Sequence, residues 1–128
     1  MTTGSPAPFD ALAPIFHEPR RLALMTALCG APRGLSFGEL KRICAVTDGN
    51  LNRHLKVLED ARVIALRKVR VGARRRTVVE ASDRGRDDFL AYLAVLEEVL
   101  HRAADAAGLE FDTVSESVRS RAAVVQPG

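Results

Sequence analysis

The sequence predicts a mainly α-helical domain with one small β-hairpin, an α+β arrangement that continues into a long helix. Three observations support this prediction. Apolar residues with helical spacing recur between Pro19 and Asp60, β-type segments follow Ala61, and helical spacing returns from about Asp83 to Ala106. The chain has 128 residues, which is the length of a single domain with an ordinary core.

Charge is distributed unevenly along the chain, although the net charge is only +3. From His17 to Arg86 there are 16 Lys and Arg against 7 Asp and Glu, whereas from Asp87 to Gly128 there are 3 against 8. A basic body followed by an acidic segment suggests a polyanion as the partner of the body. A solvated surface that is merely basic is the alternative.

Composition also restricts compartment and chemistry. The first residues, "MTTGSPAPFD", lack the basic start and apolar stretch of a signal peptide, and no apolar run is long enough to span a bilayer. We therefore expect a cytoplasmic protein that does not enter membranes. Cys29 and Cys44 form no CxxC pair and are expected to be small buried thiols, with a redox-sensing role as the alternative.

Helix boundaries are marked by local signals. Pro19 suits the first turn of a helix that ends at Gly30. Ser36 and Glu39 have the spacing of a capping box, and Leu35 and Leu40 that of a hydrophobic staple, so a second helix should begin here. Its inward residues are predicted to be Leu40, Ile43 and Cys44, and it should end near Ala45.

The segment "TDGNLNRHLKVLED" predicts a third helix. Thr47 is placed to cap it, and Leu51, Leu55 and Leu58 recur at i, i+4 and i+7 on one face. His54 lies toward the inner edge of that face and is expected to be packed and hydrogen-bonded. Two helices joined by a turn of about three or four residues form a helix-turn-helix.

Two β-type runs follow, "VIALRKVRV" and "TVVEAS", with "GARRR" between them. They predict a hairpin whose tip carries Arg74, Arg75 and Arg76. A charged tip that only blocks edge-to-edge pairing of the strand is the alternative to a binding role.

Ser82 is placed to cap the last helix, and Gly108 to end it. Apolar residues on this helix step by four and three residues, which is the pattern of a coiled-coil seam. We therefore predict a dimer interface formed by Phe89, Leu93, Leu96, Leu100 and Ala103.

Helix, helix-turn-helix, two-stranded wing and long helix follow each other in the order of a winged helix-turn-helix. The segments "FHEPRRLALMTAL", "LSFGELKRICAVTDGNLNRHLKVLEDARVI" and a wing ending in "RRRT" resemble the small single-domain members of the MarR/ArsR-type bacterial transcriptional regulators. The resemblance covers roughly Pro14 to Leu100. It implies a homodimer on double-stranded DNA, with a recognition helix in the major groove and a wing directed to the minor groove.

On this interpretation the chain comprises a flexible arm (1–8), a DNA-binding domain (9–82), a dimerisation helix (83–107) and a tail (108–128). A dimer would bind an inverted repeat with half-sites about one helical turn apart.

The DNA-binding residues are predicted from the helical wheel and the wing. Placing the leucines of the third helix inward directs Gly49, Arg53 and Lys56 outward, flanked by Asn50 and Asn52. Asn pairs with adenine and Arg with guanine, so Asn50, Asn52 and Arg53 are predicted to read bases, with Lys56 on a phosphate. The complete predicted set is Ser36, Lys41, Thr47, Gly49, Asn50, Asn52, Arg53, Lys56, Arg74, Arg75 and Arg76. An ordinary solvated helix face is the alternative.

Two departures from the family pattern bear on the fold. The glycine usual after the recognition helix is replaced by Ala61-Arg62. A left-handed residue other than glycine costs about 1 kcal/mol or more, so the turn is expected to shift by a residue. The junction before the last helix reads "EASD" where Leu-Thr is usual, but Ser82 can still cap.

Other functions are weighed against this hypothesis. Glu97, His101 and Asp105 are spaced i, i+4 and i+8, as in a metal- or small-molecule-responsive sensor, but a solvated ion-paired face explains them and no metal or cofactor is predicted. A winged helix can also serve as a protein-interaction module. No enzymatic activity is predicted, because no nucleophile with a base and no phosphate-binding glycine loop occurs in the sequence.

Overall fold

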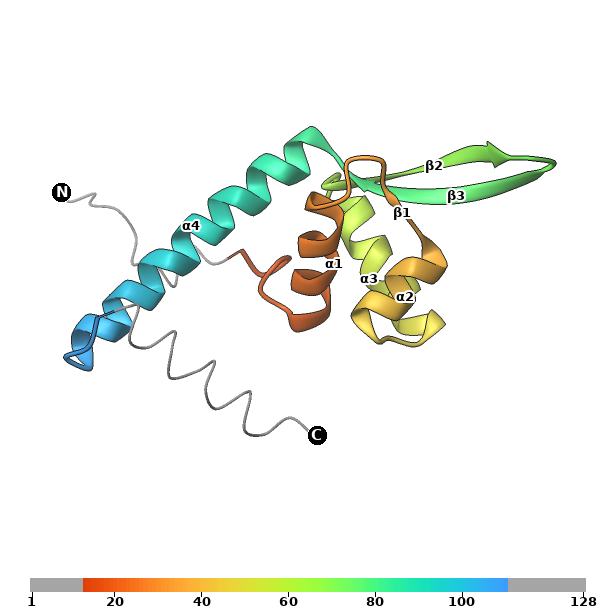
Figure 1. Cartoon of the computed structure of the whole chain (residues 1–128). Helices are drawn as coiled ribbons and strands as arrows, with labels where there is room; N and C mark the ends of the chain where they lie inside the picture. The colour runs from red at the N-terminus through yellow and green to blue at the C-terminus, as the bar shows by residue number, and fades with distance from the viewer. Residues whose placement is uncertain (1–12, 111–128) are drawn as a thin grey trace. The chain divides into compact units, whose positions relative to one another are not determined.

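The structure is a computed structural model that describes residues 13–110. The predicted arm (1–8) and all but the start of the predicted tail (108–128) lie outside these residues. The elements, in order, are α1 (Pro19–Cys29), β1 (Leu35–Ser36), α2 (Phe37–Cys44), α3 (Asp48–Asp60), β2 (Ile64–Val71), β3 (Arg74–Ala81) and α4 (Asp83–Ala106) (Figure 1). The predicted order of helices, hairpin and long helix is confirmed, and β1 is an addition to it.

The chain divides into two compact units. Of the described residues, 13–92 form the first and 93–110 belong to the second. The first turns of α4 therefore pack within the first unit. In the described residues, no helix is both long and apolar enough to cross a membrane.

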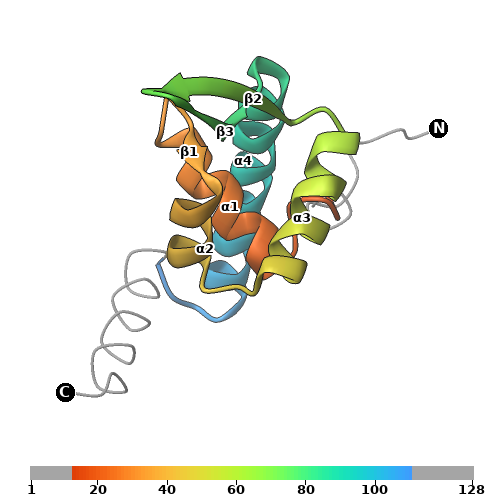
Figure 2. The same ribbon diagram turned by 90° about the vertical axis from the view of Figure 1, so that its right-hand side faces the viewer.

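Helices α1, α2 and α3, the first turns of α4 and a small sheet enclose the core of the first unit. Helix α1 packs against α2, α3 and β3 (Figure 2). The largest fully buried side chains are Phe16, Leu24, Met25, Leu28, Leu40, Leu51, Leu58, Val79 and Phe89. Full burial of one such side chain contributes roughly 1.5–3 kcal/mol, so each of these residues stabilises the first unit substantially.

Helix α2 begins at the predicted capping box. The Ser36 hydroxyl accepts the N–H of Glu39 at 3.2 Å, and the Glu39 carboxylate accepts the N–H of Ser36 at 3.2 Å. The predicted inward position of Ile43 is wrong, because this residue is 55% exposed. Leu40 and Cys44 already fill the inward face of this two-turn helix, and Ile43 is rotated about 100° from Cys44.

Helix α3 is capped by Thr47 as predicted, whose hydroxyl accepts the N–H of Asn50 at 3.3 Å. Its leucines, Leu51, Leu55 and Leu58, are buried as predicted. Between α2 and α3 lies a three-residue turn that starts with Ala45 in a left-handed conformation (φ 50°). These features confirm the helix-turn-helix.

The chain leaves α3 by the shifted turn that the missing glycine led us to expect. Ala61 stays helical, and Arg62 is left-handed with φ 63°. The N–H of Arg62 donates to the carbonyl of Glu59 at 2.9 Å, and that of Val63 to the carbonyl of Leu58 at 3.2 Å. The helix therefore ends in a Schellman-type motif with arginine in the place that glycine usually takes.

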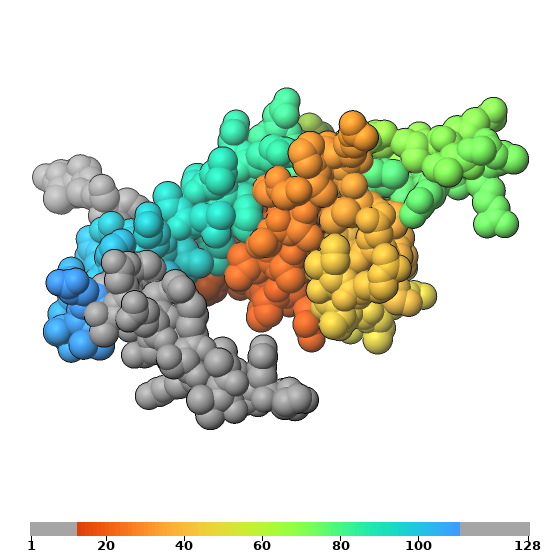
Figure 3. Space-filling model, viewed as in Figure 1, coloured from red at the N-terminus to blue at the C-terminus, as the bar shows by residue number. Residues whose placement is uncertain are grey.

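The sheet is antiparallel with strand order β1-β3-β2. β2 and β3 form a hairpin that extends away from α1, α2 and α3 (Figures 1 and 3). Its turn is only Gly72-Ala73, with Gly72 at φ 64°. The three arginines predicted at the tip are instead the first residues of β3, because the pairing of Val71 with Arg74 continues the ladder to the turn.

Helix α4 starts and ends as predicted. The Ser82 hydroxyl accepts the N–H of Gly85 at 2.9 Å and donates to the carbonyl of Arg62 at 2.8 Å. A Cβ at Gly85 would lie 1.8 Å from the Val63 carbonyl oxygen, so this glycine allows α4 to approach the chain that leaves α3. Gly108 follows the helix with φ 73°.

One residue of the predicted dimer interface, Phe89, is buried in the core of the first unit instead. Phe89 is only 2% exposed and packs against Phe16 and Tyr92, with ring centroids 5.3 and 6.0 Å away. Its ring therefore belongs to the core of its own chain and offers little surface to a second copy.

Candidate nucleic-acid interface

The outward face of α3 carries polar side chains that the core does not use. Gly49, Asn50, Asn52, Arg53 and Lys56 are all exposed. Arg53 Nη2 donates to Asn50 Oδ1 at 3.0 Å, so two of the three side chains predicted to read bases are already held together. Preorganised donors and acceptors on an exposed helix face fit the edges of bases in a major groove.

Gly49 has no structural reason to be glycine. It has no left-handed φ, and a Cβ placed on it would meet no atom within 4 Å. Glycine in a helix costs roughly 1 kcal/mol relative to alanine. Gly49 therefore lowers the stability of α3 and leaves its surface without a side chain at this position. Such a position suits the close approach of another molecule to the backbone.

Both lysines of the predicted DNA-binding set, Lys41 and Lys56, are already paired with carboxylates. Lys41 Nζ lies 2.6 Å from Asp48 Oδ1, and Lys56 Nζ lies 3.5 Å from Asp60 Oδ2. Both pairs are exposed and contribute little to stability. A phosphate would have to displace a carboxylate from either lysine, which makes them weaker phosphate ligands than an unpaired cation.

The wing arginines lie on two different faces of the hairpin. Successive residues of a strand alternate between faces, and cross-strand partners share a face. Arg75 therefore shares one face with its partner Arg70, whereas Arg74 and Arg76 lie on the other. Within residues 13–110, neither Arg70, Arg74 nor Arg75 forms an ion pair, so the outer wing carries uncompensated positive charge.

Two wing cations were missed at the level of sequence. Lys68 and Arg70 lie on β2, and Lys68 Nζ donates to the Thr77 hydroxyl at 2.7 Å across the hairpin. Pairing the two strands through the Gly72-Ala73 turn would have placed Arg70 opposite Arg75. The position of Arg70 could therefore have been predicted from the sequence if the turn had been assigned to Gly72-Ala73.

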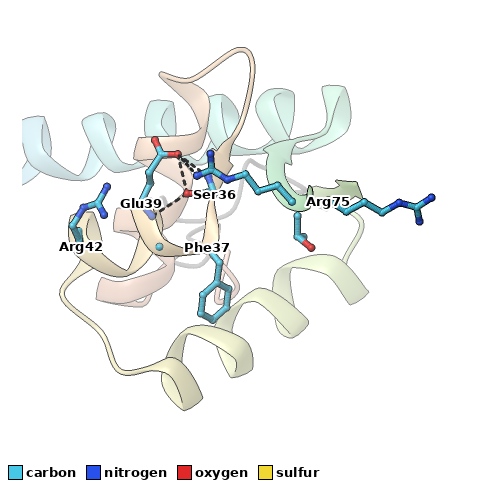
Figure 4. Close-up of a pocket in the computed structure, with 8 residues that line it drawn as sticks. Ser36, Phe37, Glu39, Arg42 and Arg75 are labelled. Atoms are coloured by element: carbon cyan, nitrogen blue, oxygen red, sulfur yellow. Dashed lines mark hydrogen bonds and ion pairs between the residues drawn. The ribbon is translucent and has the colours of Figure 1, made fainter. Parts of the chain in front are cut away.

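A pocket lies where the wing meets α2. Arg42 and Arg75 lie on opposite sides of Ser36 and Glu39 in this pocket (Figure 4). Arg76 Nη2 is 3.8 Å from Glu39 Oε1. Hydrogen bonds from the Ser36 side chain and backbone hold the pKa of the Glu39 carboxyl below its usual range, so it stays ionised.

Ser36 differs from the other predicted DNA-binding residues. It is 7% exposed, and its hydroxyl is engaged in the capping box with Glu39. Its position explains a role in starting α2 and leaves its side chain little freedom to contact another molecule.

His54 is packed and hydrogen-bonded, as predicted. It is 7% exposed, and its Nδ1 lies 3.1 Å from Nη1 of Arg21 on α1. Burial lowers the pKa of its imidazole below the usual value.

The thiols differ in environment. Cys44 is buried as predicted, but Cys29 is only partly buried. Burial raises the pKa of both thiols, which keeps them protonated and weakly reactive at neutral pH. No three His, Cys, Asp or Glu side chains in the described part of the chain are grouped so as to hold a metal ion.

Comparison with known proteins gives one family and several similar structures. The family described as "Winged helix DNA-binding domain" matches residues 20–100. An uncharacterized protein of Methanocaldococcus jannaschii is 32% identical over 79 residues, which are 62% of this chain and 85% of that protein.

Among solved structures, a transcriptional regulator homologue from Pyrococcus horikoshii OT3 is 31% identical, with a TM-score of 0.65 over 72% of this chain and 91% of that one. A putative regulator of the MarR family from Enterococcus faecalis V583 is 19% identical, with a TM-score of 0.66 over 85% and 97% of the two chains. The transcriptional repressor CouR, solved on a 23-mer DNA duplex, is 16% identical, with a TM-score of 0.67 over 94% and 82%. The last two likenesses show a shared fold.

Proposed function

The chain belongs to the winged helix DNA-binding domain family and has the fold of MarR-type transcriptional regulators, and we propose that it is a dimeric, sequence-specific DNA-binding regulator. On this proposal it acts on double-stranded DNA in the cytoplasm and catalyses no reaction. The regulator fold it shares with a repressor solved on DNA supports this view.

The outward face of α3 is the observation that carries the proposal. Asn50, Asn52 and Arg53 are exposed, and the first and last of these are joined by a 3.0 Å hydrogen bond. The buried leucines fix the opposite face of α3 against the core, so the polar face stays exposed to solvent. We propose that α3 enters the major groove, that these three residues read bases and that Lys56 contacts a phosphate.

The wing supplies the second contact. Arg74, Arg75 and Arg76 are exposed, and Arg70 adds a fourth cation beside Arg75. Arginine suits a narrow minor groove, where the negative potential is strongest. We propose that the outer wing reaches the minor groove, where the face bearing Arg70 and Arg75 has no carboxylate to compete with the DNA.

Selection of duplexes from a random DNA library would test this function. We expect an enriched inverted repeat whose half-sites lie about one helical turn apart. Affinity for the enriched duplex should exceed that for an unrelated duplex by about a thousandfold or more at physiological salt. Equal affinity for all duplexes, or no binding, would refute sequence-specific regulation.

Dimerisation is proposed to depend on the second half of α4. Leu93 and Leu96 are partly exposed and Leu100 is 41% exposed, which leaves apolar surface for a second copy. Ala103, three residues after Leu100 and also exposed, continues the same seam. Replacing Leu96 by Glu should give monomers in sedimentation and abolish tight binding to the inverted repeat.

The matched control for that experiment is Ala94→Glu, which adds the same charge at an exposed position of α4 outside the seam. It should leave the dimer intact. A monomeric wild-type protein would overturn this part of the proposal without affecting DNA binding by the first unit.

A further inference from the structure

A partly buried polar network joins the recognition helix to the N-terminal end of α1. His54 projects from the inner side of α3 and is 7% exposed. Arg21 Nη1 lies 3.1 Å from its Nδ1, and Glu18 Oε2 lies 3.8 Å from its Nε2. The network therefore joins residues separated by more than 30 positions, and none of them is used in the proposed contacts with DNA.

The hydrogen-bond partners decide which form of His54 is present. A guanidinium can only donate hydrogen bonds, so Nδ1 must be the acceptor and the imidazole must be neutral, with its proton on Nε2. That proton faces the Glu18 carboxylate, at a distance too long for a direct hydrogen bond. The observed contact between Arg21 and His54 is therefore possible only while His54 is uncharged.

Both partners of His54 are themselves held in place. Arg21 Nε donates to the Ile15 carbonyl at 2.6 Å, and Glu18 caps α1 by accepting the N–H groups of Arg20 and Arg21. Burial raises the pKa of the Glu18 carboxyl, but the hydrogen bonds from these two N–H groups and the nearby positive charges together outweigh it and keep the pKa below its usual range. Both partners are therefore fixed by contacts around the start of α1, and His54 connects α3 to them.

We propose that Arg21, His54 and Glu18 form a positioning network that holds α3 in the orientation that reads DNA, and that protonation of His54 releases it. This inference rests on the proposed function, because its main consequence is a loss of DNA affinity in acid. On protonation, the Nδ1 acceptor becomes an N–H donor directed at a guanidinium. The Arg21 contact is then lost and replaced by repulsion between two cations.

Burial of His54, more than the charged groups around it, sets the direction of the pH effect. Burial lowers the pKa of His54 from about 6.5; Glu18 opposes this, while Arg21, Arg53 and Arg20 reinforce it. In acid the unfolded chain therefore takes up the proton before the folded chain does. The contribution to stability is complete above about pH 6.5 and is lost as the pH falls through the lower, folded value.

Affinity for the selected duplex should be measured between about pH 8 and about pH 5, the range in which histidine titrates. We expect wild-type affinity to fall by about fivefold or more beyond the fall seen with His54→Gln, a coupling at the low end of the usual range. The glutamine side chain can still accept a hydrogen bond from Arg21 but does not titrate, so His54→Gln should bind the duplex as tightly as the wild type at the higher pH. Parallel pH profiles for the two proteins would overturn the proposal.

His17→Gln is the matched control. His17 is an exposed histidine that lies outside the network and contacts the Tyr92 hydroxyl instead. It should keep the wild-type pH dependence, and loss of that dependence in this variant would overturn the assignment to His54.

A second measurement needs no DNA. The melting temperature of the wild type should fall more steeply below about pH 6.5 than that of His54→Gln, and an NMR titration of the wild type should give His54 a pKa below the free value. A pKa at or above the free value would refute the network even if His54→Gln failed to fold. If no duplex is selected at all, the proposed function fails, while these two measurements still decide on the network.

Discussion

The recognition helix and the wing are both exposed and rich in polar side chains, but they are supported in opposite ways. Helix α3 is anchored by Leu51, Leu55, Leu58 and a hydrogen-bonded His54, all buried. From Ala65 to Arg76 the hairpin has no buried residue. Reading a base requires a side chain fixed to a fraction of an ångström, whereas attraction to phosphates requires only charge and reach. This difference in support agrees with the proposal that the helix supplies discrimination and the wing supplies affinity.

The strongest test of this comparison removes the anchor of α3. Leu51 is completely buried, so Leu51→Ala should destabilise the protein by about 2–5 kcal/mol through lost burial and a cavity. Urea denaturation measures this. Val71→Ala in the wing, where Val71 is 53% exposed, should change stability by less than about 0.5 kcal/mol. Comparable losses in the two variants would contradict the difference in support.

Discrimination should be lost when the reading side chain is removed. Arg53→Ala should reduce the preference for the selected duplex over a base-substituted one by about 1–3 kcal/mol, the usual contribution of a bidentate contact. Binding of both duplexes at fixed salt measures the preference. Arg84→Ala, which removes an exposed arginine of α4, should leave it unchanged. An unaltered preference in Arg53→Ala would remove this residue from the site.

The junction between the two regions contains a strain that can be relieved. Arg62 has φ 63°, so Arg62→Gly should stabilise the protein by about 1 kcal/mol in urea denaturation. The adjacent Ala61 is helical, and Ala61→Gly should destabilise it by roughly 0.5–1 kcal/mol. If both glycine variants moved stability in the same direction, the turn would not lie where the structure has it.

Gly49 separates the requirements of folding from those of binding. Gly49→Ala should raise stability by up to about 1 kcal/mol, because a helix gains from alanine and a Cβ meets no atom there. It should also weaken binding to the selected duplex, since the methyl group keeps the groove at a distance. Thermal unfolding and a binding titration measure the two effects, and unchanged affinity in a stabilised variant would exclude close approach at this site.

The wing should give the smallest and least specific effect. Arg75→Ala is expected to weaken binding of all duplexes similarly and to lower the slope of log affinity against log salt by about 1. Titrations at several salt concentrations measure this slope. Asymmetric loss between the selected and unrelated duplexes would show that Arg75 also reads sequence.

Much of the proposed interface could be predicted because it depends on residues close together in the chain. The outward positions of α3 follow from the spacing of its leucines, and its start follows from Thr47. The wing was predicted less well. Its arginines were predicted to lie in a loop. The pairing of Val71 with Arg74 follows only if the turn has two residues, Gly72 and Ala73.

Local chemistry by itself determined where each helix begins and ends. The capping box of Ser36 and Glu39, the caps at Thr47 and Ser82, and Gly108 after α4 act within a few residues, so the sequence contains the whole of each interaction. The charge difference between the basic body and the acidic segment after Asp87 is likewise complete in the sequence.

Contacts between distant segments were decided only by the tertiary structure. The pairing of β1 with β3, the exposure of Ile43, the burial of Phe89 within its own chain and the contact of Arg21 with His54 all depend on which surfaces meet. A short apolar run or a single charged residue is compatible with several such meetings. The free energy of the assembled core selects one of them, because burial and hydrogen bonding are realised only when all the elements are in place together.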